Sequence, residues 1–299
     1  MKKLLIILMI PFTSFNVNAS HLMAGEITWQ CIKDPTDQDF GKYIFTMKLY
    51  RDCDGIPLNT TSEALQVHNH PTLQNIQCHF INSFDVSPLC DPVNSGNFQL
   101  DCWGNTPVGA VEEYIYISDP IQILGSPPID GWHFTWGSCC RNGSIVNLQN
   151  PSTWGVTYRS SMYPFTDPAT GSLQADSCYD SSPVFNENPR NIICTGTPFT
   201  YSHNAYDTDM DSLVYTWDEP LNDSYNSFNP PIEPIPLPFN PPYTFDNPLP
   251  GGVVLNPETG DVSFNSNLSG SFASVVRVDS SKCGQRVSSI YREVQDVLI

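Results

Sequence analysis

Short segments rich in β-branched and aromatic residues, each bounded by Gly, Pro or Asp, recur along this chain of 299 residues. Such residues favour extended backbone, and short runs of them that recur about every 8–12 residues are typical of β-sandwiches. Only residues 61–66 suggest a helical turn, and no longer segment has the periodicity of an amphipathic helix. The sequence therefore predicts an all-β fold. Its clearest strands are expected at residues 43–50, 114–117, 133–136, 253–255, 262–264 and 274–278.

The chain opens with the layout of a secretory signal peptide. Lys2 and Lys3 precede an apolar run at residues 4–12, and small residues then lead to a cleavage site between Ala19 and Ser20. A membrane helix needs about 20 apolar residues, and neither this run nor any later one is long enough. We expect a chain that is exported to the cell surface or beyond it, without a membrane span after signal removal. The alternative, a buried N-terminal helix, fits this layout less well.

Cysteine content is the second strong constraint on the mature chain. An even number of cysteines in an exported protein predicts several disulfides, although spacing alone does not give their connectivity. Eight of the ten lie between Cys31 and Cys178, so disulfides should concentrate in the first part of the chain. The adjacent Cys139 and Cys140 are expected to reach two different partners, because a ring between neighbours is strained. The disulfide candidates are Cys31, Cys53, Cys78, Cys90, Cys102, Cys139, Cys140, Cys178, Cys194 and Cys283.

A change in composition near residue 181 predicts a domain boundary. We expect a signal peptide at 1–19, a cysteine-rich β domain at 20–180 and a second β-sandwich at 181–299, since a chain of this length accommodates two domains. Ten prolines between residues 220 and 250 prevent continuous sheet pairing there. This stretch is expected to be an ordered loop of the second domain, because long structureless loops are uncommon in compact domains. A flexible linker is the alternative.

The charge of the mature chain limits its partners. Without Lys2 and Lys3 the chain has 11 basic and 31 acidic residues, a net charge of −20. Such a surface repels phosphate backbones, so we expect no nucleic-acid partner. The same surface is compatible with divalent cations, or with solubility alone.

Three carboxylates at alternate positions, Asp207, Asp209 and Asp211, are the strongest candidate site. In a turn that leads into a strand, they could converge on Ca²⁺, which takes six to eight oxygen ligands. The spacing is like the start of an EF-hand loop. However, Ser212 and Asp218 stand where that loop needs glycine and glutamate, so an EF-hand is rejected. The alternative to calcium is a solvated turn whose aspartates cap backbone amides.

The second part of the chain resembles a cadherin-like or bacterial Ig-like repeat. The resemblance rests on Ser-Pro-Val-Phe at 182–185, Ala-Tyr-Asp-Thr-Asp at 205–209 and Leu-Val-Tyr at 213–215. The segment 249–264, which begins Leu-Pro-Gly-Gly and contains Asn-Pro-Glu-Thr-Gly, is similar to a hairpin of such repeats. The resemblance implies a seven-stranded sandwich. It also implies that Asp207, Asp209 and Asp211 are calcium ligands, with Glu187 a weaker candidate.

Several motifs in the first part extend the resemblance to the whole mature chain. They are Gly-Glu-Ile-Thr-Trp-Gln-Cys at 25–31, Leu-Tyr-Arg-Asp-Cys at 49–53, the segment 111–116, and the segment 132–143 with its Cys-Cys-Arg-Asn. Together they resemble the N-terminal region of Bacteroidota surface proteins, gliding-motility-associated or adhesin-like, that the type IX secretion system exports. The sequence up to residue 299 contains neither the further Ig array nor the sorting domain that this resemblance implies. We therefore expect either a piece of a longer protein or another route of export.

Two further patterns could indicate chemistry. Glu112 and Glu113 could suggest a glycosidase, but neighbours on a strand point to opposite faces, whereas glycosidases need two carboxylates across one cleft. His68 and His70, like the Cys78-His79 pair, could suggest zinc, but no spacing supplies a complete ligand set. We expect exposed histidines rather than a zinc site, and Cys78 in a disulfide.

Aromatic side chains raise a carbohydrate-binding alternative, because exposed rings can stack on sugars, although burial in the core explains most such residues. The rings in question are those of Trp29, Trp103, Trp132, Trp136, Trp154 and Trp217.

The function expected first is non-enzymatic display at the cell surface, for adhesion or gliding, with calcium as a stabilising ion. Its partners would be an extracellular protein, a glycan, or further domains of a longer chain. A carbohydrate-binding module is the second hypothesis, and a secreted hydrolase is the third.

Overall fold

The computed structural model describes residues 22–87, 100–104, 109–174, 178–223 and 235–299. The signal segment with Ala19 and Ser20, and also Cys90, therefore lie outside the described residues. Within them the secondary structure is β apart from one 3₁₀ turn, Pro151–Thr153, which confirms the all-β prediction. In the same ranges no helix has the length and apolar character needed to cross a membrane.

Eighteen strands are present in the described ranges. In chain order they are β1 (Leu22–Cys31), β2 (Tyr43–Asp52), β3 (Ser62–His68), β4 (Asn75–Asp85), β5 (Val111–Ser118), β6 (Trp132–Ser138), β7 (Val156–Met162), β8 (Thr166–Asp167), β9 (Ser172–Leu173), β10 (Val184–Phe185), β11 (Ile192–Ile193), β12 (Phe199–Ser202), β13 (Ala205–Tyr206), β14 (Ser212–Trp217), β15 (Val254–Leu255), β16 (Asp261–Phe264), β17 (Gly270–Lys282) and β18 (Gln285–Leu298).

Eight strands form a ring of antiparallel pairs. The order is β1-β2-β5-β4-β3-β6-β7-β18, and β18 also pairs with β1, so the hydrogen-bonding path returns to its start. Within it, β2 to β5 are arranged as a Greek key, because β5 returns to lie between β2 and β4. The β3 strand occupies the segment expected to form a helical turn, so that expectation is wrong. Long-range pairing with β4 and β6 fixes it as extended backbone.

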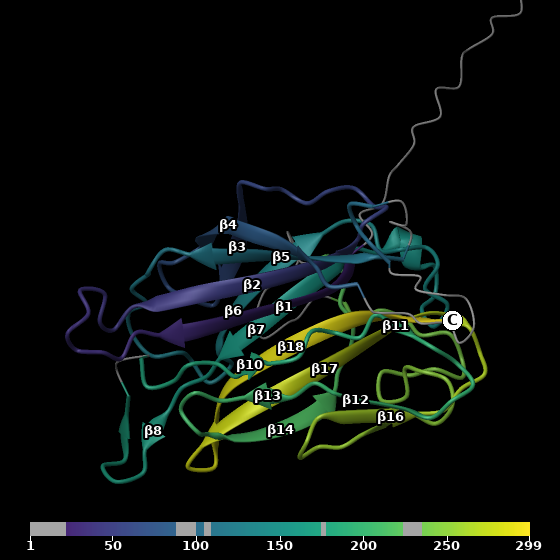
Figure 1. Ribbon diagram of the computed structural model, residues 1–299. Coiled ribbons are helices and arrows are strands. Elements are labelled where there is room, and N and C mark those ends of the chain that lie inside the picture. Colours follow the sequence, from purple (N-terminus) through teal and green to yellow (C-terminus); the bar gives the residue numbers. More distant parts are fainter. Residues whose placement is uncertain (1–21, 88–99, 105–108, 175–177, 224–234) are drawn as a thin grey trace, which may run out of the picture.

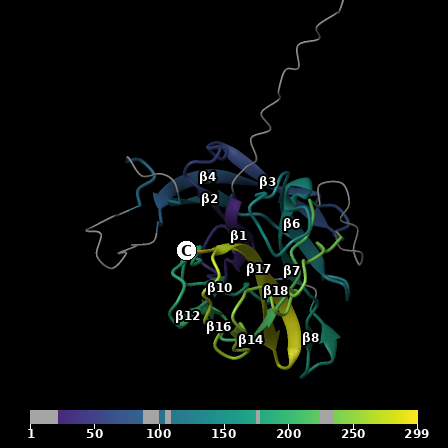
Figure 2. The ribbon, with the colours of Figure 1, turned by 90° about the vertical axis from the view of Figure 1, so that its right-hand side faces the viewer.

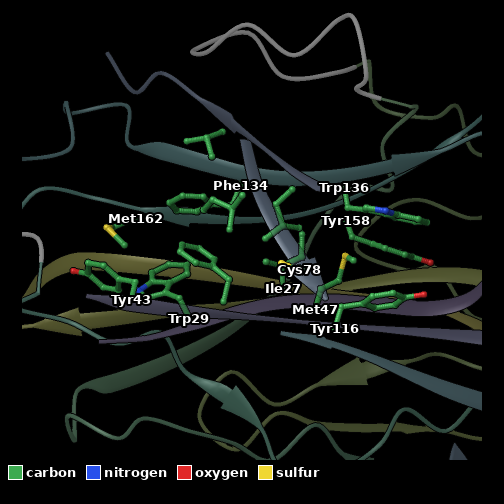
Figure 3. Packing of buried hydrophobic residues seen from close by; sticks show 14 of the residues in the cluster. Ile27, Trp29, Tyr43, Met47, Cys78, Tyr116, Phe134, Trp136, Tyr158 and Met162 are labelled. Atoms are coloured by element: carbon green, nitrogen blue, oxygen red, sulfur yellow. The ribbon is translucent and has the colours of Figure 1, made fainter. Parts of the chain in front are cut away.

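The interior of the ring is an aromatic core. Along β2 the side chains of Tyr43, Phe45 and Met47 are buried, and those between them are more exposed, as the two-residue period of a strand requires. Figure 3 shows side chains from β1, β2 and β5 meeting those from β6 and β7. Gly25 of β1 lets the Tyr158 ring pack on the backbone, since a Cβ there would lie 2.1 Å from that ring.

The long hairpin of β17 and β18 connects the ring to a second layered region, because β18 belongs to the ring and β17 pairs with β14. The strands turn at Cys283 and Gly284, whose positive φ angles of 51° and 76° suit a two-residue hairpin loop. In Figures 1 and 2 the hairpin lies between the ring strands on one side and β12, β14 and β16 on the other. The small sheet β12-β16-β15 faces the hairpin across a second core, which includes Ile193, Val262, Phe264, Phe272 and Leu298.

Hydrogen bonding is continuous across the boundary expected near residue 181. One edge of β18 pairs with β17 over most of its length, and the other edge pairs in turn with β7, β1 and β11. The first and second regions of the chain therefore share one sheet. The division into two domains at 20–180 and 181–299, and the cadherin-like type of the second, stay predictions.

The described part of the proline-rich stretch, residues 235–250, is tied to the segment 145–149. Asn240 donates from Nδ2 to the carbonyls of Val146 and Leu148, both at 2.9 Å. The buried Asn147 donates to the carbonyls of Pro248 (2.9 Å) and Ala273 (2.8 Å). Proline has no backbone N–H to donate in a sheet. The side-chain amides of Asn147 and Asn240 therefore supply the donors that these carbonyls need. These are contacts of an ordered loop, and they reach back to a segment before residue 181.

Three disulfides connect described cysteines: Cys31–Cys178, Cys53–Cys102 and Cys139–Cys140. The expectation of separate partners for Cys139 and Cys140 is wrong. The two are bonded to each other in the loop after β6, where a φ of 75° at Cys140 turns the backbone. Cys78 is also not in a disulfide. It is a buried thiol in the core, and burial raises the pKa of that thiol to about 12. Cys194 and Cys283 are exposed thiols.

Candidate functional site

The aspartate turn connects β13 to β14, and its first residue holds the turn together. Asp207 Oδ1 accepts hydrogen bonds from the backbone amides of Asp209 (2.8 Å) and Asp211 (3.3 Å). Its Oδ2 accepts one from the Ser280 hydroxyl of β17 at 3.0 Å. Asp207 therefore does what the alternative to calcium expected, because its carboxylate caps amides of its own turn.

Asp209 contacts groups outside the turn and does not join the group that Asp207 and Asp211 form with Asp180. Its Oδ1 lies 2.5 Å from Lys33 Nζ, and its Oδ2 accepts a hydrogen bond of 2.6 Å from the Ser181 amide. Both carboxylate oxygens are thus occupied by groups outside the turn. Asp209 connects the turn to the chain just after β1 and to the link at residue 181.

Asp180 takes the place beside Asp207 and Asp211 that the sequence pattern gave to Asp209. One ligand oxygen from each of Asp180, Asp207 and Asp211 lies within 4.8 Å of the others. Asp180 is fully buried, and no N–H or hydroxyl group of the described residues donates to its carboxylate, whose hydrogen-bonding neighbour is the carboxyl of Asp211. We call Asp180, Asp207 and Asp211 the acidic cluster. Sequence reasoning missed Asp180 because it follows Cys178 in a segment without a motif.

Burial and like charge control the protonation of the acidic cluster. Burial raises the pKa of Asp180 well above its usual range, and the nearby carboxyls of Asp207 and Asp211 raise it further. The pKa of Asp207 is also raised, mainly by burial. Lys282 opposes these effects, with its Nζ 2.7 Å from Asp211 Oδ2. One ammonium group therefore faces three carboxyls.

The segment that carries Asp180 is fixed along β1. Ser182 donates its backbone N–H to the Trp29 carbonyl at 3.0 Å, and the Ser182 hydroxyl accepts from the Trp29 amide at 2.9 Å. The Ser181 hydroxyl accepts from the Cys31 amide at 3.2 Å, and the Cys31–Cys178 disulfide lies beside it. We call residues 178–182 the link. These contacts hold Asp180 in a defined position under the aspartate turn.

Glu187, the weaker calcium candidate, does not belong to the acidic cluster. Its side chain is exposed and lines a polar cleft of about 380 Å³ together with Asp85 and Arg190. Its backbone carbonyl accepts a 2.7 Å hydrogen bond from Arg292.

The adjacent glutamates of β5 are both engaged. Glu112 accepts two hydrogen bonds from Arg51, at 3.0 and 2.7 Å. Glu113 accepts one from the Tyr50 hydroxyl at 2.7 Å and lies 3.3 Å from Lys48 Nζ. Both carboxylates are buried, and each contacts a different set of side chains, so they do not face one another across a cleft.

The histidines considered for zinc are also separated. His68 Nε2 lies 2.7 Å from the Thr135 hydroxyl, whereas the His70 ring packs on Trp132 with centroids 4.5 Å apart. His79 is exposed beside Asp119, and its neighbour Cys78 points into the core. The only group of three metal-ligating side chains in the described ranges is the acidic cluster.

The tryptophans differ in exposure. Trp29, Trp132 and Trp136 are buried in the core of the ring. Trp154 packs beside the proline-rich loop and donates its ring N–H to the Gln149 carbonyl at 2.8 Å. Trp103 is 68% exposed, next to the Cys53–Cys102 disulfide.

Comparison of the chain with protein-family models, with curated proteins and with solved structures finds no match.

Proposed function

We propose that this chain is an exported, non-enzymatic module that displays a binding surface outside the cell, in adhesion or gliding. The observation that carries the proposal is the shared strand β18, which belongs to the ring and to the second layered region. A continuous sheet keeps loops at both ends of the molecule at fixed distances. Fixed loops favour recognition, because little conformational freedom is lost when a partner binds.

The chemistry of the described residues supports a structural rather than a catalytic role. The buried carboxylates of Glu26, Glu112 and Glu293 are each paired with an arginine, at Arg292, Arg51 and Arg141 respectively. Each of these carboxylates is fixed by its arginine inside the protein, whereas a general acid or base must reach a substrate. Three disulfides support a role in an oxidising exterior.

The resemblance to Bacteroidota surface proteins supports adhesion or gliding as the biological setting. The partner would be an extracellular protein, a glycan, or further domains of a longer chain. The acidic surface favours a neutral or basic partner.

The display proposal is tested by attaching the folded mature chain to beads and measuring their retention under flow on polysaccharide and matrix-protein surfaces. Beads carrying reduced, unfolded chain are the control. We expect retention that depends on the folded chain, with no product released from glycoside, ester or peptide substrates. Equal retention by folded and unfolded chains would contradict display, and turnover of any substrate would contradict the non-enzymatic role.

Carbohydrate binding is the second candidate, and the exposed ring of Trp103 is the observation that favours it. Stacking of an aromatic ring on a sugar needs an accessible face. Trp103→Ala should abolish binding on a glycan array, whereas Phe40→Ala should leave binding unchanged. Phe40 is the matched control because it is 54% exposed on another loop. Equal glycan binding by the wild type and Trp103→Ala would remove this candidate.

A further inference from the structure

Asp180 is a buried carboxyl group without a counterpart of its own. No N–H or hydroxyl group of the described residues donates to its oxygens, and the groups beside it in the acidic cluster are also carboxyls, of which Asp211 is within hydrogen-bonding reach. Burial of an ionised carboxylate without a partner is strongly unfavourable, so such a group in a folded protein holds a proton or contacts a cation.

The charges around the acidic cluster leave room for a cation. Lys282 contacts Asp211, and Lys33 contacts Asp209 outside the cluster. The cluster therefore has a single ammonium contact for three carboxyls. Two oxygens bound to the same Ca²⁺ ion, each at 2.3–2.6 Å, can be at most about 5 Å apart. The oxygens of the cluster satisfy this limit, since they lie within 4.8 Å of one another.

We propose that Asp180, Asp207 and Asp211 bind one divalent cation, best matched by Ca²⁺, and that the Lys282 ammonium leaves Asp211 when the ion enters. An all-oxygen ligand set suits a hard cation, and Ca²⁺ tolerates the irregular geometry of side chains from separate segments. Zn²⁺ is a poorer match because the cluster contains no nitrogen or sulfur ligand. Water would complete the coordination.

This ligand set differs from the one expected from the sequence, and the difference changes what the ion does. Three ligands within one turn would stabilise that turn alone. Asp180 instead comes from the link, which is bonded to β1, while Asp207 contacts β17 through Ser280. The ion would therefore connect the ring to the second layered region. The inference does not depend on what the chain displays.

The test uses the full mature chain after treatment with a chelator. Calorimetric titration with CaCl₂ should give one binding site, and the melting temperature should be higher in CaCl₂ than in chelator. Absence of binding heat together with equal melting temperatures would overturn the proposal.

Variants test the ligand set. Asp180→Asn should weaken Ca²⁺ binding by about tenfold or more, because affinity follows the number of charged ligands. It should also raise the melting temperature in chelator, since the unpaired buried carboxyl is removed. Asp209→Asn is the matched control from the same turn, and it should keep binding within about threefold. If Asp209→Asn abolishes binding and Asp180→Asn does not, the assignment of ligands is wrong.

Lys282→Met tests the Ca²⁺ affinity of the acidic cluster in a variant that keeps all three proposed ligands. Removal of an ammonium group that competes with the ion should tighten Ca²⁺ binding. Unchanged or weaker binding by Lys282→Met would show that Lys282 does not compete for Asp211, which would overturn the displacement step. The variant also keeps the proposal testable if Asp180→Asn does not fold.

Discussion

At the scale of single residues, buried acids are the least expected feature of this molecule. Asp296, near the end of β18, is buried and accepts a 2.6 Å hydrogen bond from the Ser274 hydroxyl. Burial raises the pKa of this carboxyl to about 7. Above about pH 4 the unfolded chain releases this proton, whereas the folded protein still holds it. The contribution of Asp296 to the free energy of unfolding is therefore largest below about pH 4. It falls as the pH rises from about 4 through about 7, and above that it no longer changes.

Asp296→Asn should remove this part of the pH dependence. The amide oxygen can still accept the hydrogen bond from Ser274, and the group has no proton to lose. Relative to the wild type, the variant should gain roughly 2–4 kcal/mol between about pH 4 and about pH 8, since each pKa unit represents about 1.4 kcal/mol. Urea unfolding of both proteins across this range measures the gain, and other titrating groups cancel in the comparison. A constant difference would mean that Asp296 is already ionised in the folded protein.

The acidic cluster could be predicted only in part from the spacing of aspartates in the sequence. Alternate spacing identified Asp207 and Asp211, because both lie in one tight turn. It did not give the direction of Asp209, which Lys33 and Ser181 determine. It could not give Asp180, whose position depends on the pairing of the link with β1 more than 140 residues earlier. Local sequence carries no information about such contacts.

At the scale of elements, the junction of β1 and β18 contains a buried ion pair. Arg292 Nε lies 2.5 Å from Glu26 Oε2, and both side chains are almost completely buried. The guanidinium also donates to the Glu187 carbonyl at 2.7 Å and to the Tyr201 hydroxyl at 3.1 Å, and it lies over the Phe185 ring. Loss of the arginine would leave a buried carboxylate at the closing pair of the ring.

Arg292→Met should reduce the free energy of unfolding by about 3–5 kcal/mol, the cost typical of breaking one side of a buried pair. Lys42→Met, which breaks the more exposed pair with Asp39, is the matched control and should cost less than about 1 kcal/mol. Urea unfolding at neutral pH measures both. The double variant Glu26→Gln/Arg292→Met should cost less than the sum of its single changes. Equal costs for Arg292→Met and Lys42→Met would contradict the importance of this pair.

Element prediction succeeded where a strand has strong local character. The segments 43–50, 114–117 and 133–136 are strands because their alternating aromatic and β-branched residues face the core. The segment 61–66 has little such character, and its neighbours β4 and β6 decide its conformation. The full length of β17 and β18 was also not predicted. Most of their polar residues are buried against other strands, which hydropathy does not reveal.

At the scale of the whole molecule, the shared sheet predicts cooperative unfolding. The first and second regions can separate in only two ways. Either β18 loses its pairing with β17, or it loses its pairing with both β1 and β7. With the disulfides intact, calorimetry should show one transition whose calorimetric and van't Hoff enthalpies agree. Hydrogen exchange provides a second measurement, in which β2 and β16 should lose protection at the same denaturant concentration. Two transitions, with β16 exchanging first, would show that the regions unfold separately.

The sequence placed a boundary at a real change in composition, because most cysteines precede residue 181. It could not show that strands from both ends of the chain are neighbours, since the Glu26–Arg292 contact spans 266 positions. Composition therefore located the disulfides of the first region but not the sheet that continues beyond them.

The pairing of β1 with β18 also has a consequence for the order in which the chain can fold during its synthesis. β1 is synthesised long before β18, and the ring closes only when residues 292–294 meet residues 24–26. Until then β1 lacks its second neighbour, and a partly emerged chain cannot complete its fold. Contacts so distant along the chain form slowly. The ring of such a chain would stay open during synthesis and would close only after β18 has been made.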